Sequence, residues 1–141
     1  MAETLTPPTG RETPVAVLEA RDLTPGDLTA EAARLRDDGW RPATVTCVAA
    51  SDQGAELIYH FQRGMDLVHY RMLVPGGVTP PSLTSLFPCA FLAENEIQDQ
   101  FGLAFEGLTP DLKGRMYMHG GTPPLRGQAE PEPAGGEGES A

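Results

Sequence analysis

Three segments in which apolar and polar residues alternate constrain the fold of this chain more than any other feature. They span residues 43–50, 55–63 and 66–74, and only a few polar residues separate each from the next. Alternation is the pattern of strands that bury one face, and connections this short join antiparallel neighbours. His60 and His69 fall on the more polar face. The sequence therefore predicts an antiparallel meander whose buried face is formed by Leu57, Tyr59, Phe61, Val68, Tyr70 and Met72.

A helix is predicted immediately before the meander, over residues 24–38. Thr24 is suited to the N-cap, Pro25 to the first helical position, and Asp27 completes a capping box with Thr24. Gly39 marks the end of the helix, since glycine readily adopts the left-handed conformation found there. Apolar residues recur at helical spacing at Leu28, Ala32 and Leu35. We therefore expect an α+β fold with two layers, in which helices pack on a mainly antiparallel sheet.

Composition sets the limits of the folded part. Residues 1–13 are rich in Thr, Pro and Glu, and residues 122–141 consist mostly of Pro, Gly, Ala and Glu. Such segments have few side chains that can build a core. We therefore expect a flexible N-terminus over 1–13, one domain over 14–121 and a disordered acidic tail over 122–141. The domain is expected to begin with residues 14–20, as a short strand or an extended lead-in.

A second helix is predicted in the stretch FLAENEIQDQFG, residues 91–102. At about 100° per residue, one stripe of this helix contains Ala90, Ala93, Glu94, Ile97 and Phe101. Glu94 therefore lies on the stripe that should face the core, whereas Glu96 and Asp99 lie elsewhere. A buried carboxylate must be paired or protonated, so we expect Glu94 to have a partner outside this segment.

Net charge and length exclude several classes of function. The 141 residues suffice for one domain with a modest core, and 20 acidic residues against 10 basic ones give a net charge of −10. This charge argues against binding to nucleic acid or to an anionic lipid surface. The N-terminus lacks the features of a signal peptide, and no apolar run approaches the roughly 20 residues of a membrane helix. We therefore expect a cytoplasmic protein that reaches a membrane only through a partner.

No residue pattern indicates an active site or a metal site. The sequence contains no Gly-rich phosphate loop, no GxSxG motif and no HExxH motif. Cys47 and Cys89 lie far apart, and neither they nor the histidines have metal-ligand spacing. We therefore expect no catalytic, cofactor-binding or metal-binding residues in this chain. A small enzyme that uses the carboxylates of Glu94, Glu96 and Asp99 is the alternative, although no nucleophile accompanies them.

The stretch PSLTSLFPCAFLAENEIQDQFGLAFEG, with the PDLKG that follows, resembles the signature of the 30-kilodalton hydrophilic subunit of respiratory complex I. The helix and three-stranded meander also occur in the order typical of that family, so the resemblance covers roughly residues 14–118. Asn95 stands where the family has arginine, GLTPD is one residue longer than the family's GHPD, and Gly114 replaces a basic residue. The ENE, QDxFG and DxKGxxYM patterns are more similar to the corresponding small subunit of energy-converting membrane-bound nickel–iron hydrogenases. The positions that match the signature are Glu94, Glu96, Asp99, Phe101, Gly102, Phe105, Gly107, Pro110, Asp111 and Leu112.

The resemblance implies a non-catalytic accessory subunit. Members of this family bind no cofactor and pack against the catalytic large subunit in the cytoplasmic arm, at the inner face of the cell membrane. Iron–sulfur clusters, and a nickel–iron centre or quinone, are then expected in the large subunit and the iron–sulfur small subunit. An energy-converting hydrogenase is the expected parent complex, and an NADH–quinone oxidoreductase is the alternative. A regulatory binding module that uses the acidic tail as its contact is a further alternative.

The acid-rich helix is the part of the chain expected to contact a partner subunit. A carboxylate on a desolvated face is retained where a cation meets it. We therefore expect Glu94 to pair with an arginine or lysine of a neighbouring chain, or with Lys113 or Arg115 of this chain. The residues expected at the subunit interface are Glu94, Glu96, Asp99, Phe101, Gly102, Asp111 and Lys113.

Overall fold

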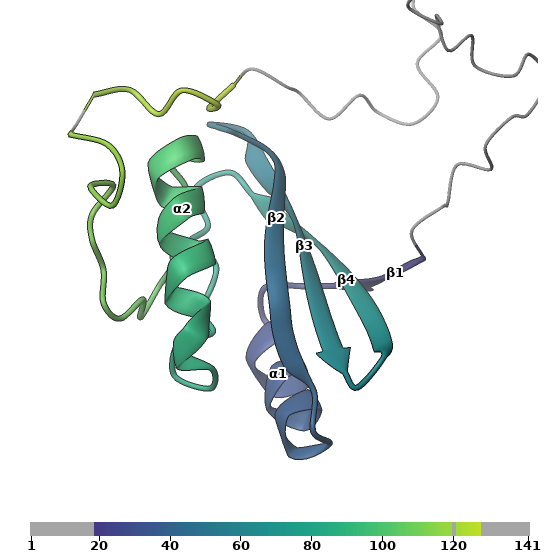
Figure 1. The fold of residues 1–141 in the computed structure, drawn as a ribbon. Helices are drawn as coiled ribbons and strands as arrows, with labels where there is room; N and C mark the ends of the chain where they lie inside the picture. Colours follow the sequence, from purple (N-terminus) through teal and green to yellow (C-terminus); the bar gives the residue numbers. More distant parts are fainter. Residues whose placement is uncertain (1–18, 120, 128–141) are drawn as a thin grey trace, which may run out of the picture.

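The computed structural model describes residues 19–119 and 121–127, which form a 4-stranded sheet with helices packed on it (Figure 1). The strand order is β1-β4-β3-β2, with antiparallel pairing of β2, β3 and β4 and parallel pairing of β1 with β4. This arrangement confirms the predicted α+β class with a mainly antiparallel sheet. In chain order the elements are β1 (Ala20–Leu23), α1 (Leu28–Asp37), β2 (Arg41–Ser51), β3 (Gly54–Arg63), β4 (Asp66–Pro75), the 3-10 helix η1 (Pro88–Ala90) and α2 (Phe91–Phe101).

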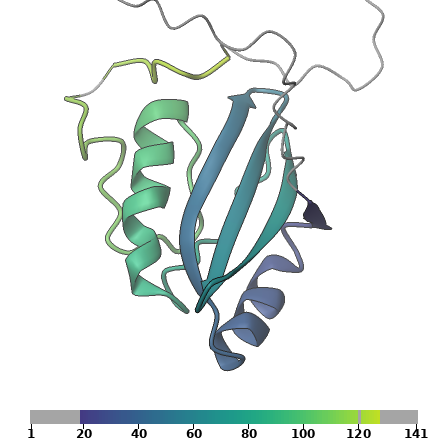
Figure 2. The ribbon, with the colours of Figure 1, turned by 45° about the vertical axis from the view of Figure 1, so that its right-hand side comes forward.

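The meander of β2, β3 and β4 lies where the alternating residues predict it, and the three strands run side by side (Figure 2). At the turn into β3, Gly54 has a φ of +143°, and a Cβ there would come within 2.5 Å of the Val74 carbonyl oxygen. That turn therefore requires glycine. The predicted inward-facing side chains are buried, except that Val68 is partly buried and packs against the core.

One predicted element lies mostly outside the described residues, and another begins later than the sequence indicates. The predicted strand or lead-in at 14–20 lies mostly outside the described residues, and β1 covers Ala20–Leu23. The predicted start of the first helix at Thr24 is wrong, because α1 begins at Leu28. The Thr24 hydroxyl donates to the Asp27 carboxylate at 2.8 Å rather than accepting from a backbone amide. The capping box is therefore not formed, and the chain makes a turn before the helix.

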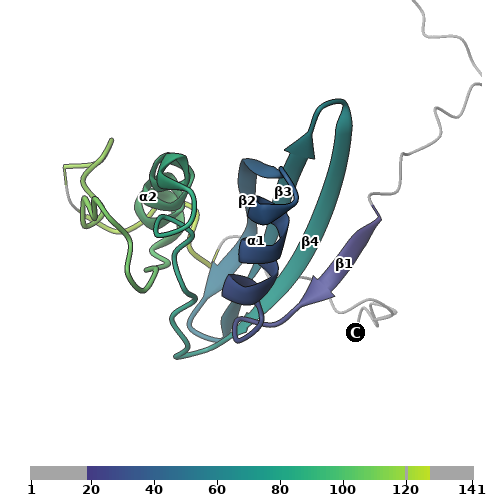
Figure 3. The same ribbon diagram turned by 90° about the horizontal axis from the view of Figure 1, so that it is seen from below.

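Both helices pack on the same face of the sheet. Leu28 and Leu35 of α1, Ile97 of α2 and inward-facing strand residues such as Tyr59 belong to one buried cluster. Figure 3 shows α2 beyond β2, at the end of the sheet away from β1. The other sheet face is not covered within the described part of the chain, and Leu73 on it is 53% exposed. In the same residues, no helix is long and apolar enough to cross a membrane.

The chain on either side of α2 runs along that helix. Ser82, which precedes the helix, donates its backbone N–H to the Glu106 carbonyl oxygen at 2.8 Å, and Glu106 N–H donates to Pro80 at 2.8 Å. After Gly102, which ends α2 with a φ of +67°, the chain first runs beside the segment that precedes α2, where Phe105 and Leu108 join the core, and then passes along the side of the helix that faces away from the sheet (Figure 1). We call this segment, residues 103–118, the arm.

The predicted acidic tail begins at residue 122, yet residues 122–127 make specific contacts with the domain. Gly127 N–H donates to the Ala50 carbonyl oxygen of β2 at 2.8 Å. The Arg126 guanidinium donates to the Phe101 carbonyl oxygen at 3.0 Å and so satisfies the C-terminal end of α2. The rest of the predicted tail, and the flexible segment predicted at the N-terminus, lie outside the described residues.

Candidate functional site

Helix α2 buries three polar side chains, which is unusual for an 11-residue helix. Glu94 and Asn95 are 0% exposed, and Asp99 is 2% exposed. Buried polar groups must find hydrogen-bond partners, because an unsatisfied one costs about 1–3 kcal/mol. These side chains find their partners outside the helix, in the segment that precedes it and in the arm. Together they connect α2 to both segments.

Glu94 is held by neutral groups. Its carboxylate accepts a hydrogen bond from the Leu83 backbone N–H at 2.7 Å and another from the Ser82 hydroxyl. The burial predicted from its place on the apolar stripe is confirmed. The predicted cationic partner is wrong, since Lys113 and Arg115 are both exposed in the arm and a fully buried carboxylate is out of reach of a neighbouring chain. Glu94 therefore fixes the backbone before η1.

The surroundings of Glu94 favour its neutral form. Burial raises the pKa of Glu94, and the hydrogen bonds from Leu83 and Ser82 lower it by less. The hydroxyl of Tyr59 is buried in the same region and has no hydrogen-bond partner within the described residues. Burial is the main cause that raises the pKa of Tyr59, and a negative charge on Glu94 raises it further. Among the described residues, no cation lies near enough to an ionised Glu94 to offset its desolvation.

Asn95 uses its whole amide to hold the arm. Its side-chain NH2 donates to the carbonyl oxygens of Phe91 and Pro110, each at 2.8 Å. Its Oδ1 accepts from the Leu112 backbone N–H at 2.9 Å. In the sequence, Asn95 stands out only as a departure from the family pattern. An amide where the family has a charged residue was the available signal that this position is buried.

Asp99 and its neighbour Gln98 hold the next part of the arm. The Asp99 carboxylate accepts from the backbone N–H of Tyr117 at 2.6 Å and of Met116 at 3.3 Å. Gln98 donates to Asp111 at 3.0 Å, and the same Asp111 oxygen accepts from the Lys113 backbone N–H at 2.9 Å. The bond from Lys113 is the main cause that lowers the pKa of Asp111, followed by the bond from Gln98.

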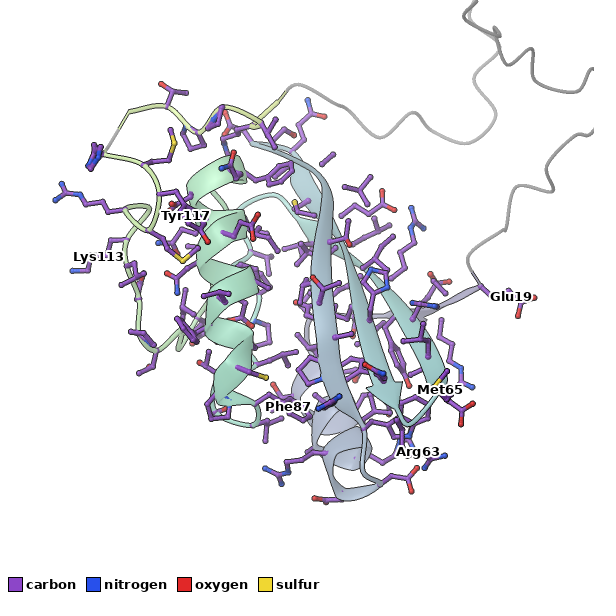
Figure 4. All side chains as sticks on the ribbon, in the orientation of Figure 1. Glu19, Arg63, Met65, Phe87, Lys113 and Tyr117 are labelled. Atoms are coloured by element: carbon purple, nitrogen blue, oxygen red, sulfur yellow. The ribbon has the colours of Figure 1, made fainter. Side chains whose placement is uncertain are left out.

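The predicted interface residues therefore fall into two groups. Glu94 and Asp99 lie inside and act on the surface only through the backbone that they hold. Phe101 is half-buried and packs against the core. The other predicted interface residues are exposed, namely Glu96, Gly102, Asp111 and Lys113. The side chain of Lys113 points away from α2 (Figure 4).

The carboxylates of α2 do not converge on one site. Glu94 contacts the segment before η1, Asp99 contacts the arm, and Glu96 is exposed. Within residues 19–119 and 121–127, no group of three potential metal ligands is found. Burial raises the pKa of the Cys47 thiol to about 12, so this cysteine is a packed thiol rather than a nucleophile. The geometry gives no support to acid–base chemistry by these carboxylates.

The uncovered sheet face carries a pair of histidines in contact. His60 and His69 lie opposite each other in β3 and β4, with 2.7 Å between their Nδ1 atoms, and His60 Nε2 lies 3.0 Å from the Thr46 hydroxyl. One ring nitrogen must accept a hydrogen bond from the N–H of the other ring, so the hydrogen bond is lost when both rings are charged. Burial, and then the neighbouring His69, lower the pKa of His60.

This lowered pKa predicts a loss of stability in mild acid. The unfolded chain binds a proton at His60 more readily than the folded chain does. The contribution of neutral His60 to the free energy of unfolding is therefore full above the ordinary pKa of about 6.5, and it is lost as the pH falls through the lowered pKa. Urea unfolding between about pH 5.5 and 7 measures the effect. We expect His60→Gln to flatten the pH dependence, whereas His119→Gln, at an exposed histidine of the described chain, leaves it unchanged. If the free energy of unfolding changed equally with pH in the wild type and both variants, the expectation would be contradicted.

The polar side chains of α2 bind the segment before the helix and the arm after it, so that one helix holds two flanking segments beside the sheet. This chain belongs to the family described as respiratory-chain NADH dehydrogenase, 30 Kd subunit, whose model matches residues 22–133. The resemblance found in the sequence is therefore confirmed, and the chain is a subunit of the complex I 30-kilodalton type. No curated protein matches the chain.

The fold is shared with a chain in the solved structure of the membrane-bound sulfane sulfur reductase (MBS), an archaeal respiratory membrane complex. The two chains are 20% identical, with a TM-score of 0.53, and the match covers 72% of this chain and 70% of that one. At 20% identity, this similarity is evidence of a shared fold alone.

Proposed function

We propose that this chain is a non-catalytic accessory subunit that packs against the catalytic large subunit in the cytoplasmic arm of a membrane-bound respiratory complex. The observation that carries the proposal is the use of Glu94, Asn95 and Asp99 to hold loops rather than to form a reaction site. A family of complex subunits supplies the context. A rigid surface built by buried polar groups suits a protein that binds other subunits.

The proposed parent complex is an energy-converting nickel–iron hydrogenase. The departures at Asn95 and Gly114, and the ENE and DxKGxxYM patterns, support this choice. The shared fold of a chain from a sulfane sulfur reductase complex shows that the fold is not restricted to NADH dehydrogenases. An NADH–quinone oxidoreductase is the second candidate, because the matching family carries that enzyme's name. In either case the proposed partners, the large subunit and the iron–sulfur small subunit, hold the iron–sulfur clusters and the nickel–iron centre or quinone site.

Affinity purification of the full-length chain from its own cells tests this proposal. With an N-terminal tag and a mild detergent, we expect a large subunit and an iron–sulfur small subunit to co-purify in equal amounts with the chain from the membrane fraction. Mass spectrometry identifies the subunits, and hydrogen evolution against NADH–quinone reduction distinguishes the two parent complexes. Recovery of the chain alone, with turnover of its own, would refute the accessory role.

A further inference from the structure

The outer part of the arm, residues 112–118, is a cationic segment in an acidic chain. It contains Lys113 and Arg115 and no acidic residue, although the whole chain has a net charge of −10. Both side chains are exposed. The net charge of this segment is therefore positive, whereas that of the whole chain is negative.

Most cations of the described chain already have a carboxylate partner. Five arginines form ion pairs with N–O distances between 2.5 and 3.4 Å, namely Arg34, Arg36, Arg63, Arg71 and Arg126. Lys113 and Arg115 form no such pair with any described residue, and the same holds for Arg21 and Arg41 elsewhere on the surface. The charge of Lys113 contributes to the lowered pKa of the neighbouring Asp111, but no described carboxylate forms an ion pair with either arm cation, so both can meet an external group.

Apolar side chains accompany these cations. Tyr117 is 62% exposed and Leu112 is 37% exposed, so both offer apolar area at the surface. A groove passes between the arm and α2, lined by Lys113, Arg115 and Met118 among others. Tyrosine and arginine are the residues enriched where protein interfaces gain most of their affinity. A surface of this mixed kind matches a protein better than it matches a phosphate-bearing polymer.

The backbone of this segment is held in place before any partner arrives. Asn95 accepts from the N–H of Leu112, and Asp99 accepts from the N–H of Met116 and Tyr117. Lys113 has a φ of +54°, a conformation that is uncommon for a residue with a side chain, and its N–H is bound by Asp111. A fixed backbone lowers the entropy lost when the surface binds.

We propose that residues 112–118 dock onto an acidic, partly apolar surface of a partner protein, with carboxylates facing Lys113 and Arg115 and an apolar pocket receiving Tyr117. The inference rests on the proposed function, which supplies the large subunit as the partner. It adds which surface of this chain binds the partner, and the acidic, partly apolar character of the partner surface that receives it. Glu94 and the uncovered sheet face take no part in this contact.

The test compares two charge reversals of equal size in the tagged full-length chain, expressed in its own cells. One variant carries Lys113→Glu with Arg115→Glu, and the control carries Arg21→Glu with Arg41→Glu, at the other cations without an ion pair. We expect the ratio of large subunit to chain in the eluate to fall about tenfold or more for the arm variant and less than about twofold for the control. Thermal unfolding of each purified variant verifies that it is folded.

The outcomes separate this inference from the proposed function. A wild-type eluate without any large subunit overturns the proposed function. A large subunit that co-purifies equally with the wild type and the arm variant overturns the docking surface and leaves the proposed function standing. Binding of the wild-type chain to vesicles of zwitterionic lipid with about 30% anionic lipid, lost in the arm variant, would assign the surface to a membrane instead. A tenfold fall confined to the arm variant, without vesicle binding, supports the proposal.

Discussion

Glu94→Ala is expected to lower the free energy of unfolding by about 2–4 kcal/mol, whereas Glu94→Gln keeps most of that stability. Alanine leaves the Leu83 N–H and the Ser82 hydroxyl without their buried partner and opens a cavity beside the core. Glutamine retains the shape of the side chain. Its Oε1 can accept from Leu83, and its NH2 can donate to the Ser82 oxygen after the hydroxyl rotates.

The two proteins should also differ in their response to pH. The folded-state pKa of Glu94 is raised, so its stabilising contribution is full below the ordinary value of about 4.3 and is lost as the pH rises through the raised pKa. Glutamine does not titrate. The stability of Glu94→Gln relative to the wild type is therefore expected to increase from about pH 5 to pH 8, while Glu94→Ala stays less stable throughout.

Urea unfolding of the purified chain at several pH values measures these differences. Glu96→Ala is the matched control, because Glu96 lies on the same helix and is exposed. We expect it to change the stability by less than about 0.5 kcal/mol. A Glu94→Gln protein that becomes less stable relative to the wild type as the pH rises would show that an ionised carboxylate is needed, and would require a cationic partner after all.

The sheet could be predicted because its strands carry their own signal. Alternation over β2, β3 and β4 sets which side chains face the core, and short turns set the pairing of neighbours. The strand β1 is different. Its four residues, ARDL, do not alternate, and it is placed by parallel pairing with β4, far along the chain. Such a short edge strand depends on tertiary contacts that no local pattern contains.

At the start of α1, the residues of a capping box are present but form a different hydrogen bond. Thr24 and Asp27 have the spacing of a capping box, but the Thr24 hydroxyl donates to the Asp27 carboxylate, and the Asp27 backbone N–H is bound at 3.1 Å by the Thr24 carbonyl oxygen instead of the hydroxyl. The end of the helix was predicted better. Gly39 has a φ of +84°, and Trp40 N–H returns to the Leu35 carbonyl oxygen at 2.9 Å.

Helical periodicity predicted the burial of Glu94 but could not predict that of Asn95 and Asp99. The stripe of apolar residues marks only the face of α2 that meets the sheet. Another face is covered by the arm, whose own sequence has no regular period, so nothing local indicated that polar residues there are buried. The partner of Glu94 was missed for a related reason. The Leu83 backbone N–H and the Ser82 hydroxyl supply it: a backbone donor leaves no trace in the residue types, and Ser82 lies in a segment without regular period.

Replacing Asp99 is expected to free the arm without unfolding the domain. In Asp99→Asn, one of the two oxygens becomes an NH2 that faces the backbone N–H of Met116 or Tyr117, so one hydrogen bond is lost and two donors oppose each other. We expect the free energy of local opening at residues 112–118 to fall by about 2 kcal/mol, which corresponds to roughly thirtyfold faster amide exchange there.

Hydrogen exchange followed by mass spectrometry resolves this change by segment. Exchange in β3, at the centre of the sheet, should stay as slow as in the wild type, and Glu96→Gln on the same helix should leave the arm unchanged. If residues 112–118 bind the partner as proposed, Asp99→Asn should also lower the recovery of the large subunit, because the partner must then order a mobile backbone. Faster exchange across the whole domain would instead show that Asp99 stabilises the core. Unchanged exchange in the arm would show that other contacts hold it.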